Sequence, residues 1–314
     1  MAAAAREPVS DSSLARFSAL CQVGCVFEGF NEWDIPGADG VAIHGRSDGS
    51  GLPVVLLHGH PRTHATWYAV APLLVAAGRT VVCPDLRGYG RSSTPQPDPG
   101  HEVYCDRAMA HDVVAVMAAL GDERFSVVGH DRGSYVAYRC ALDHPSRVAA
   151  LAVLDSVPIV EALERSNAHF AERWWHWFFA TSHAERVITA DPLGWYQLDA
   201  EAMGRENYSD VELAITDPAT VRAMLEDYRA GLHVDRRHDE EAHAAEQTIA
   251  CPTLVGWSRD DDMADLYGDL AAVWEPRCSG TVSSGVINTG HHMAEQDPAG
   301  LATLLDHFLT NAQP

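Results

Sequence analysis

The sequence predicts an α/β fold in which a mostly parallel sheet is covered by helices on both faces. Three observations lead to this prediction. Short apolar runs recur along the chain, stretches with helical periodicity separate them, and residues 156–247 interrupt the alternation with a long segment that lacks strand patterns. Alternating strands and helices are typical of parallel sheets, because each crossover helix returns the chain to the next parallel strand.

The expected strands are short apolar runs of the kind that a parallel sheet buries on both faces. They cover residues 54–57, 80–83, 125–128, 149–154, 252–257 and 281–286, and residues 26–30 and 41–43 suit an entry hairpin. Between the second and third runs, Met109, Val113 and Val116 form one stripe of a helix. Near the C-terminus, Asp297 and Pro298 are typical of an N-cap and a first helical turn.

The segment at residues 156–247 predicts a helical insertion with a dense aromatic cluster at residues 174–179. We expect it to cover the carboxyl edge of the sheet, where open α/β sheets bind ligands. The expected organisation is an N-terminal extension (1–25), a core (26–155 and 248–314) and a helical cap (156–247) inserted after the sixth strand.

Composition excludes several classes of function. Acidic residues outnumber basic residues 44 to 22, and a net charge of -22 disfavours nucleic acid and anionic membranes as partners. All basic residues are arginine, which excludes Schiff-base lysine chemistry and Walker-type phosphate loops. Seven scattered cysteines and an N-terminus without an apolar signal segment predict a cytoplasmic protein with reduced thiols.

The strongest local motif is GHDRG at residues 129–133, between an expected strand and an apolar helix. Small residues two before and two after a nucleophile permit the sharp turn of a nucleophile elbow. Asp131 stands where serine is usual, and a carboxylate there can attack carbon and form an ester. The alternative is that Asp131 only caps the helix. Its place between strand and helix favours the elbow.

Residues 58–61 (HGHP) follow the strand at 54–57 and suggest an oxyanion hole. Its donors would be the backbone N–H groups of His60 and Arg132. His58, His60 and His64 also raise the question of a metal site. Residues 62 and 63 lack the Asp-His pair of a dinuclear zinc motif, so no metal is expected.

A late loop at residues 289–292 (TGHH) supplies the expected base, His291, in preference to its neighbour His292. A histidine this late in the chain fits the order nucleophile, acid, base that accompanies a nucleophile elbow between a strand and a helix. These motifs resemble the α/β-hydrolase fold, in the branch of dehalogenases and epoxide hydrolases, as does DLRGYG at residues 85–90.

More narrowly, the chain resembles the fluoroacetate (haloacetate) dehalogenases from about residue 27 to residue 309. The resemblance rests on the elbow, on residues 141–145 (ALDHP) and 151–155, and on two cap motifs, WHW at 175–177 and DYRAG at 227–231. It implies hydrolysis of a small 2-haloacid, such as fluoroacetate or chloroacetate, to a 2-hydroxy acid and halide through an aspartyl ester. It also implies a small-molecule substrate, no metal or organic cofactor, and a homodimer.

The resemblance assigns a role to each matching residue. Asp131 would be the nucleophile, His291 the base for water, and Asp155 the acid that orients His291. Arg132 would hold the substrate carboxylate. The leaving halide would accept hydrogen bonds from three cap residues, namely His176, Trp177 and Tyr228. A basic leaving fluoride requires several preorganised donors of this kind.

Three departures from the family pattern affect these expectations. Tyr135 replaces a second arginine, so a substrate carboxylate would lose a charge-assisted bond of roughly 1.5–3 kcal/mol. A larger, chlorinated or less anionic substrate therefore fits better than fluoroacetate. His60 replaces the usual aromatic residue of the pocket wall. Asp261, after the strand at 252–257, is an alternative to Asp155 as the acid.

Other functions remain open on the sequence. An epoxide hydrolase would use the same triad with two cap tyrosines, Tyr228 and either Tyr196 or Tyr208. A ligand-binding protein of this fold without turnover is an alternative of another class. A serine esterase is disfavoured by Asp131, and a haloalkane dehalogenase by Arg132, where that family has tryptophan.

Overall fold

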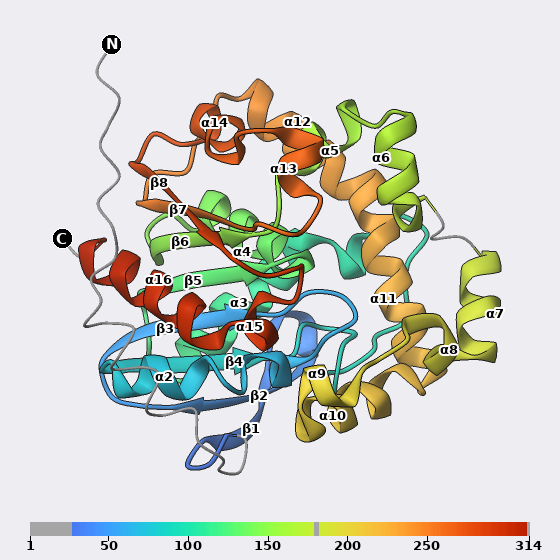
Figure 1. Ribbon diagram of the computed structural model, residues 1–314, viewed down its shortest axis with the longest axis horizontal. Coiled ribbons are helices and arrows are strands. Elements are labelled where there is room, and N and C mark those ends of the chain that lie inside the picture. Colours follow the sequence, from blue (N-terminus) through green and yellow to red (C-terminus); the bar gives the residue numbers. More distant parts are fainter. Residues whose placement is uncertain (1–26, 179–181, 313–314) are drawn as a thin grey trace.

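A computed structural model describes residues 27–178 and 182–312 of the 314-residue chain. An eight-stranded sheet in the order β1-β2-β4-β3-β5-β6-β7-β8 runs through its centre (Figure 1). β2 pairs antiparallel with β1 and β4, and the remaining pairs are parallel. The strands are β1 (Asn31–Pro36), β2 (Ala42–Asp48), β3 (Leu52–Leu57), β4 (Arg79–Pro84), β5 (Phe125–His130), β6 (Val148–Leu154), β7 (Thr253–Ser258) and β8 (Val282–Ile287).

Helices cover both faces of the sheet because successive strand side chains point in opposite directions. In β3, Val54 and Leu56 pack into the layer with α2 and α16, and Val55 and Leu57 pack into the layer with α3 and α4. The helical elements of the core are η1 (Ala38–Gly40), η2 (His64–Trp67), α2 (Ala71–Ala76), η3 (Glu102–Tyr104), α3 (Asp106–Ala119), α4 (Arg132–Asp143), α13 (Met263–Tyr267), α14 (Leu270–Trp274), η6 (Glu275–Arg277), α15 (Met293–Gln296) and α16 (Pro298–Asn311).

Two helices follow directly from the sequence pattern. The stripe of Met109, Val113 and Val116 is the buried face of α3. At the start of α16, the Asp297 carboxylate accepts a hydrogen bond from the Gly300 N–H group at 2.9 Å, as an N-cap does. Both predictions are confirmed.

The cap lies between β6 and β7, and its described residues form helices, several of which stand beside one end of the sheet (Figure 1). Its elements are α5 (Ile159–Glu164), α6 (Ala168–Arg173), η4 (Trp175–Trp177), α7 (Ser182–Ala190), α8 (Pro192–Tyr196), α9 (Ala200–Met203), α10 (Arg205–Ile215), α11 (Pro218–Ala230), η5 (Gly231–Asp235) and α12 (Arg236–Ala244). The predicted α/β fold with a helical insertion after the sixth strand is confirmed.

The expected strand at residues 26–30 is wrong. Residues 27–29 form a turn, and the first strand is β1, which pairs with β2 as the other arm of the hairpin. Gly29 has a φ of +88°, which favours glycine and turns the chain before β1. The expected N-terminal extension, residues 1–25, lies outside the described residues. Among the described helices, none is long and apolar enough to span a bilayer.

Candidate active site

Asp131 occupies a sharp turn between β5 and α4, with φ 52° and ψ -120°. This positive φ is rare for a residue other than glycine and is characteristic of strained functional positions. A Cβ atom at Gly129 would lie 2.2 Å from the Gly133 carbonyl oxygen, and one at Gly133 would lie 2.5 Å from the His58 oxygen. The side chain of Asp131 does not cap α4. The geometry is therefore that of an elbow, and the helix-cap alternative does not hold.

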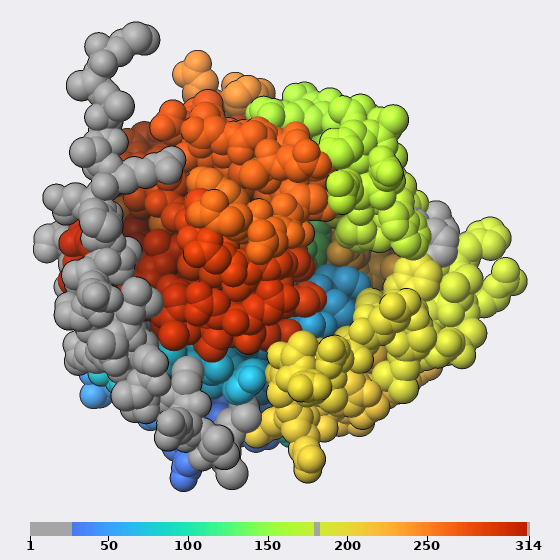
Figure 2. Space-filling model, viewed as in Figure 1, coloured from blue at the N-terminus to red at the C-terminus, as the bar shows by residue number. Residues whose placement is uncertain are grey.

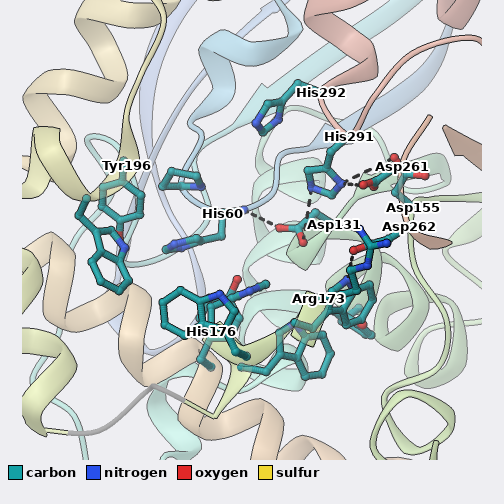
Figure 3. Close-up of a pocket in the computed structure, with 17 residues that line it drawn as sticks. His60, Asp131, Asp155, Arg173, His176, Tyr196, Asp261, Asp262, His291 and His292 are labelled. Atoms are coloured by element: carbon teal, nitrogen blue, oxygen red, sulfur yellow. Dashed lines mark hydrogen bonds and ion pairs between the residues drawn. The ribbon is translucent and has the colours of Figure 1, made fainter. Parts of the chain in front are cut away.

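The Asp131 carboxylate lies between His60 and His291 (Figure 3). The His60 N–H group donates to Asp131 Oδ1 at 2.7 Å, and His291 Nε2 lies 3.9 Å from Oδ2. Burial opposes ionisation, but the charge of His291 and the N–H groups of His60 and Arg132 hold the pKa of Asp131 below its usual value. The carboxylate is thus ionised, and it is held by the same two N–H groups that the sequence suggested as oxyanion-hole donors.

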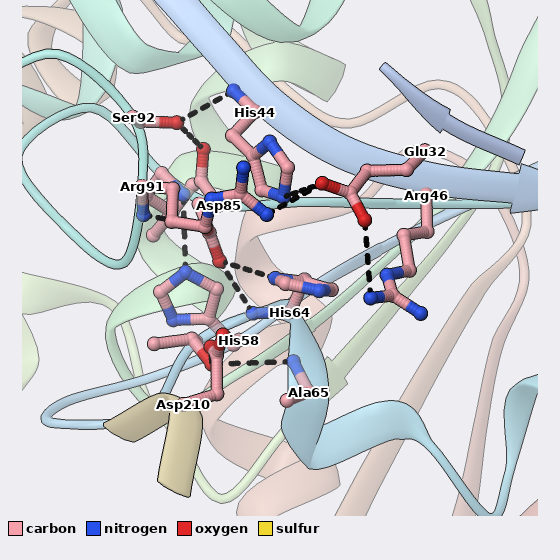
Figure 4. A network of polar contacts seen from close by, with 12 residues as sticks. Glu32, His44, Arg46, His58, His64, Ala65, Asp85, Arg91, Ser92 and Asp210 are labelled. Atoms are coloured by element: carbon pink, nitrogen blue, oxygen red, sulfur yellow. Dashed lines mark hydrogen bonds and ion pairs between the residues drawn. The ribbon is translucent and has the colours of Figure 1, made fainter. Parts of the chain in front are cut away.

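Hydrogen bonds join the segment after β3, which contains His58 and His64, to the segment after β4, which begins at Asp85 (Figure 4). Asp85, after β4, accepts from the backbone N–H and Nδ1 of His64 at 2.7 and 2.8 Å. His58 Nε2 accepts from the Leu86 N–H group at 3.0 Å. Glycine is required at position 59, next to His60, since a Cβ atom there would lie 2.4 Å from Asp131 Oδ1. His58 and His64 therefore hold these segments together and do not line the cavity at Asp131.

The acid that contacts His291 is Asp261. His291 Nδ1 lies 2.8 Å from Asp261 Oδ2 and 3.8 Å from Asp155 Oδ2. Asp155 accepts instead from the N–H and Oγ–H groups of Ser258, both at 2.7 Å. The sequence resemblance favours Asp155 as the residue that orients His291. The geometry instead favours Asp261, the alternative. β6 and β7 are neighbours that end at the same edge, so both acids arrive there, and Ser258 holds Asp155 back.

His291 is electrostatically tuned by three carboxylates. Burial disfavours the imidazolium ion, but the hydrogen bond to Asp261 and the charges of Asp131 and Asp155 raise the pKa of His291 to about 10. The resting site therefore contains an imidazolium ion next to an ionised Asp131. His292 also lines the cavity, and burial lowers its pKa. Within the described residues, His291 is the one histidine with an imidazole ring nitrogen within 4.0 Å of the Asp131 carboxylate.

A cavity of about 360 Å³ separates Asp131 from the cap. It opens at a hollow where the red and orange core residues meet the green and yellow cap residues (Figure 2). His176, Trp177 and Tyr228 line it, as the resemblance implied. Burial lowers the pKa of His176 and raises that of Tyr228, so both side chains are uncharged at neutral pH.

Of the two tyrosines considered as partners for Tyr228, Tyr196 lines the cavity. The Tyr208 hydroxyl donates to Glu212 at 3.1 Å on its own helix, away from the cavity. Burial raises the pKa of Tyr196, so its hydroxyl keeps its proton. The cap therefore presents two phenol groups to the space above Asp131.

Arg132 is not where a substrate carboxylate would bind. Its side chain is 1% exposed and does not line the cavity. Nε donates to Asp227 Oδ1 at 3.1 Å, and Nη2 donates to the Asp227 carbonyl oxygen at 3.0 Å. The guanidinium carbon lies 5.0 Å from the ring centre of Tyr135 and 5.1 Å from that of Tyr228. The structure therefore pairs Arg132 with the Asp227 carboxylate behind the cavity wall and does not place its guanidinium group among the lining residues, where the expected carboxylate ligand would lie.

Sequence reasoning missed the partners that decide these positions. Asp227 belongs to a motif that the sequence presents clearly, but nothing in the sequence pairs it with Arg132, 95 residues away. Ser258, which holds Asp155, gives no signal beyond its place at the end of β7. Asp262, which accepts from the Trp174 indole N–H at 2.8 Å, lies in the acidic run that suggested Asp261.

Comparisons with known proteins agree with this architecture. A family model for the alpha/beta hydrolase fold matches residues 53–298. The chain is 38% identical to a fluoroacetate dehalogenase from Burkholderia sp, covering 92% of this chain and 96% of that protein. It is 28% identical to a soluble epoxide hydrolase from Corynebacterium sp., covering 83% and 91%.

Among solved structures, a putative alpha/beta hydrolase from Nostoc sp superposes with a TM-score of 0.86 at 38% identity, covering 90% of this chain and 99% of that one. The elbow, the carboxyl-edge site, the helical cap and these similarities lead to one conclusion. The chain belongs to the α/β hydrolase fold family, in the branch that includes fluoroacetate dehalogenase and soluble epoxide hydrolases.

Proposed function

We propose that this chain hydrolyses a carbon–halogen bond of a small molecule through an ester on Asp131. The observation that carries the proposal is the ionised Asp131 carboxylate, held by the His60 N–H group and facing His176, Trp177 and Tyr228 across the cavity. The similarity to a fluoroacetate dehalogenase supports the same chemistry. The sequence-based substrate, a 2-haloacid, needs a cation that the cavity wall does not offer through Arg132.

In the first step, Asp131 Oδ2 attacks the carbon that bears the halogen. The new C–O bond forms as the carbon–halogen bond breaks, and its electron pair leaves with the halide. Hydrogen bonds from the His176, Trp177 and Tyr228 side chains would stabilise the departing anion, because preorganised donors act most strongly where charge develops. Ester formation removes the negative charge of Asp131.

In the second step, His291 acts as the base. The Asp131 charge is one of the causes that raise the pKa of His291, so ester formation lowers that pKa and favours loss of the proton. Neutral His291 then takes a proton from water, which attacks Asp131 Cγ. The N–H groups of His60 and Arg132 hold the charge on Oδ1, and collapse of the intermediate releases an alcohol and restores Asp131.

A second candidate, epoxide hydrolysis, is favoured by one specific observation. Tyr196 and Tyr228 both line the cavity with protonated hydroxyls, so two phenols can donate hydrogen bonds to an opening epoxide oxygen. Asp131 and His291 would play the same parts. The soluble epoxide hydrolase among the relatives supports this alternative.

Halide release separates these functions. The purified protein is incubated with fluoro- and chloro-substituted small molecules and, in parallel, with a styrene-type epoxide, and each reaction is repeated with Asp131→Asn. Halide release that is lost in Asp131→Asn supports the proposal, and diol formation without halide release moves the function to epoxide hydrolysis. The proposal fails if Asp131→Asn, checked for slow deamidation, releases halide at the wild-type rate. Binding without any turnover identifies the protein as a non-catalytic member of the fold.

A further inference from the structure

Resting on the proposed function, we propose that the cavity selects an uncharged halogenated substrate, such as a haloamide, over the carboxylate of the same shape. The structural basis is that Asp227 binds the arginine next to the nucleophile, while the cavity wall itself is lined by carboxylates. Asp227 would thus be the residue that determines whether the cavity prefers an uncharged or a negatively charged substrate.

The charges on the cavity wall disfavour an anion. The carboxylates among the described lining residues are Asp131, Asp155, Asp261 and Asp262. Two cationic side chains line the same cavity. His291 lies against Asp131 and Asp261, and the half-exposed Arg173 lies 3.8 Å from Asp265 at the rim. Each cation in the described wall therefore already has an anionic partner.

Arg132 adds no positive charge that a substrate could use, because its guanidinium group is paired with Asp227. Two of its three guanidinium nitrogens, Nε and Nη2, donate to Asp227, and Nη2 lies 4.0 Å from Asp106. The third nitrogen, Nη1, has no partner, and it lies beside Gly231 rather than in the cavity wall. Burial raises the pKa of Asp106 to about 7, so the Asp227 carboxylate is the group that neutralises the guanidinium charge behind the wall.

The remaining polar groups of the wall are uncharged hydrogen-bonding groups. Tyr135 presents a phenol that burial keeps protonated. Burial lowers the pKa of His60 to about 3, and it also lowers the pKa values of His176 and His292. Neutral imidazole and phenol groups can both donate and accept hydrogen bonds. They suit an amide or a hydroxyl group, which carries donors as well as acceptors.

A carboxylate substrate would also place a second anion next to the Asp131 nucleophile. Like charges a few ångströms apart repel strongly where water is excluded, and the described lining residues supply no unpaired cation to offset this repulsion. An amide of the same size keeps the shape, the carbon–halogen bond and the carbonyl group, and lacks the charge. The charge of the substrate is therefore the property on which this cavity discriminates.

Matched pairs of substrates test the proposal directly. Fluoroacetamide is compared with fluoroacetate, and chloroacetamide with chloroacetate, by halide release with the wild-type protein and with Asp131→Asn to subtract thiol alkylation. We expect kcat/KM for each amide to exceed that for its acid by roughly tenfold or more. Equal or faster turnover of the acids would overturn the inference and leave the proposed function intact. Absence of halide release from all four compounds would refute the proposed function, and the inference with it.

A pair of variants tests the role of Asp227. Asp227→Asn removes the charge that neutralises Arg132, so the ratio of acid to amide kcat/KM should rise by roughly tenfold. Tyr89→Phe is the matched control, because it removes the 2.6 Å hydrogen bond from the Tyr89 hydroxyl to Asp227 and keeps the charge. That control should leave the ratio unchanged. If Asp227→Asn slows both substrates equally, Asp227 has only a structural role and its assignment fails. If the variant does not fold, the wild-type ratio still decides the proposal.

Discussion

Replacing Asp261 with asparagine should change the pH dependence of the second chemical step. Asp261 Oδ2 lies 2.8 Å from His291 Nδ1, and the two groups carry opposite charges in the resting site. Asparagine keeps an acceptor oxygen but loses the charge. A hydrogen bond to a charged group contributes roughly 1.5–3 kcal/mol, and one pKa unit corresponds to about 1.4 kcal/mol. The pKa of His291, about 10, should therefore fall by roughly one to two units.

The matched variant is Asp155→Asn. Asp155 Oδ2 lies 3.8 Å from His291 Nδ1, so this change removes a nearby charge but no hydrogen bond to the imidazole. The pKa of His291 should fall in this variant too, but by less than in Asp261→Asn. At residue 155, an asparagine oxygen can still accept from the Ser258 N–H group, and its NH2 group can donate to Ser258 Oγ once that hydroxyl rotates, which keeps the two variants structurally comparable.

The assay is the rate of ester hydrolysis as a function of pH, measured by rapid quench and intact mass. Neutral His291 is the active base, so a lower pKa moves the rising limb of the profile to lower pH. The maximum rate of Asp261→Asn should also fall, because the acid no longer fixes the imidazole. A larger shift and a larger loss in Asp155→Asn than in Asp261→Asn would refute the assignment of Asp261 as the partner of His291.

Three further predictions concern the elbow, the cap and stability. Gly59→Ala places a Cβ atom 2.4 Å from Asp131 Oδ1 and should lower kcat by roughly 100-fold. The control Gly290→Ala, whose Cβ atom would lie at an ordinary 3.5 Å from Gln296, should not lower kcat. Equal rates for the two variants, with unchanged circular dichroism, would contradict this reasoning. Tyr196→Phe should slow epoxide opening by about 100-fold and spare halide release, whereas Tyr228→Phe should slow both; an unchanged epoxide rate in Tyr196→Phe would remove Tyr196 from the site. The pKa of His291 is raised from 6.5 to about 10 on folding, so its stabilising contribution is complete below about pH 6.5 and is lost as the pH rises towards 10. Urea unfolding of His291→Gln should therefore show a smaller loss of unfolding free energy over that window than the wild type, and parallel curves would contradict the raised pKa.

The fold and the elbow at Asp131 could be predicted because their signals are local. The apolar runs of the central strands, the α3 stripe and the glycines around Asp131 each lie within a few residues of the feature that they specify. The elbow in particular needs Gly129 and Gly133, since any side chain there would collide with the backbone. Such requirements are visible in a single sequence.

The partners within the site could not be predicted, because they depend on contacts between distant segments. Asp155 and Asp261 end neighbouring strands, and the choice between them is made by Ser258, which binds Asp155. The environment of Arg132 is set by Asp227 on α11, a cap helix that the sequence does not position over α4. The motif identified Arg132 as the arginine that follows Asp131. The motif could not show that the guanidinium group of Arg132 points towards Asp227.

The central claim is that Asp131 forms a covalent ester, and a single turnover in H₂¹⁸O tests it most directly. Enzyme in excess over a substrate that releases halide should incorporate ¹⁸O into the peptide that contains Asp131, because water attacks the Asp131 carbonyl carbon. The alcohol formed in that first turnover should carry the original ¹⁶O of the carboxylate. Appearance of ¹⁸O in the first-turnover product, with an unlabelled Asp131 peptide, would show direct attack by water and contradict the account.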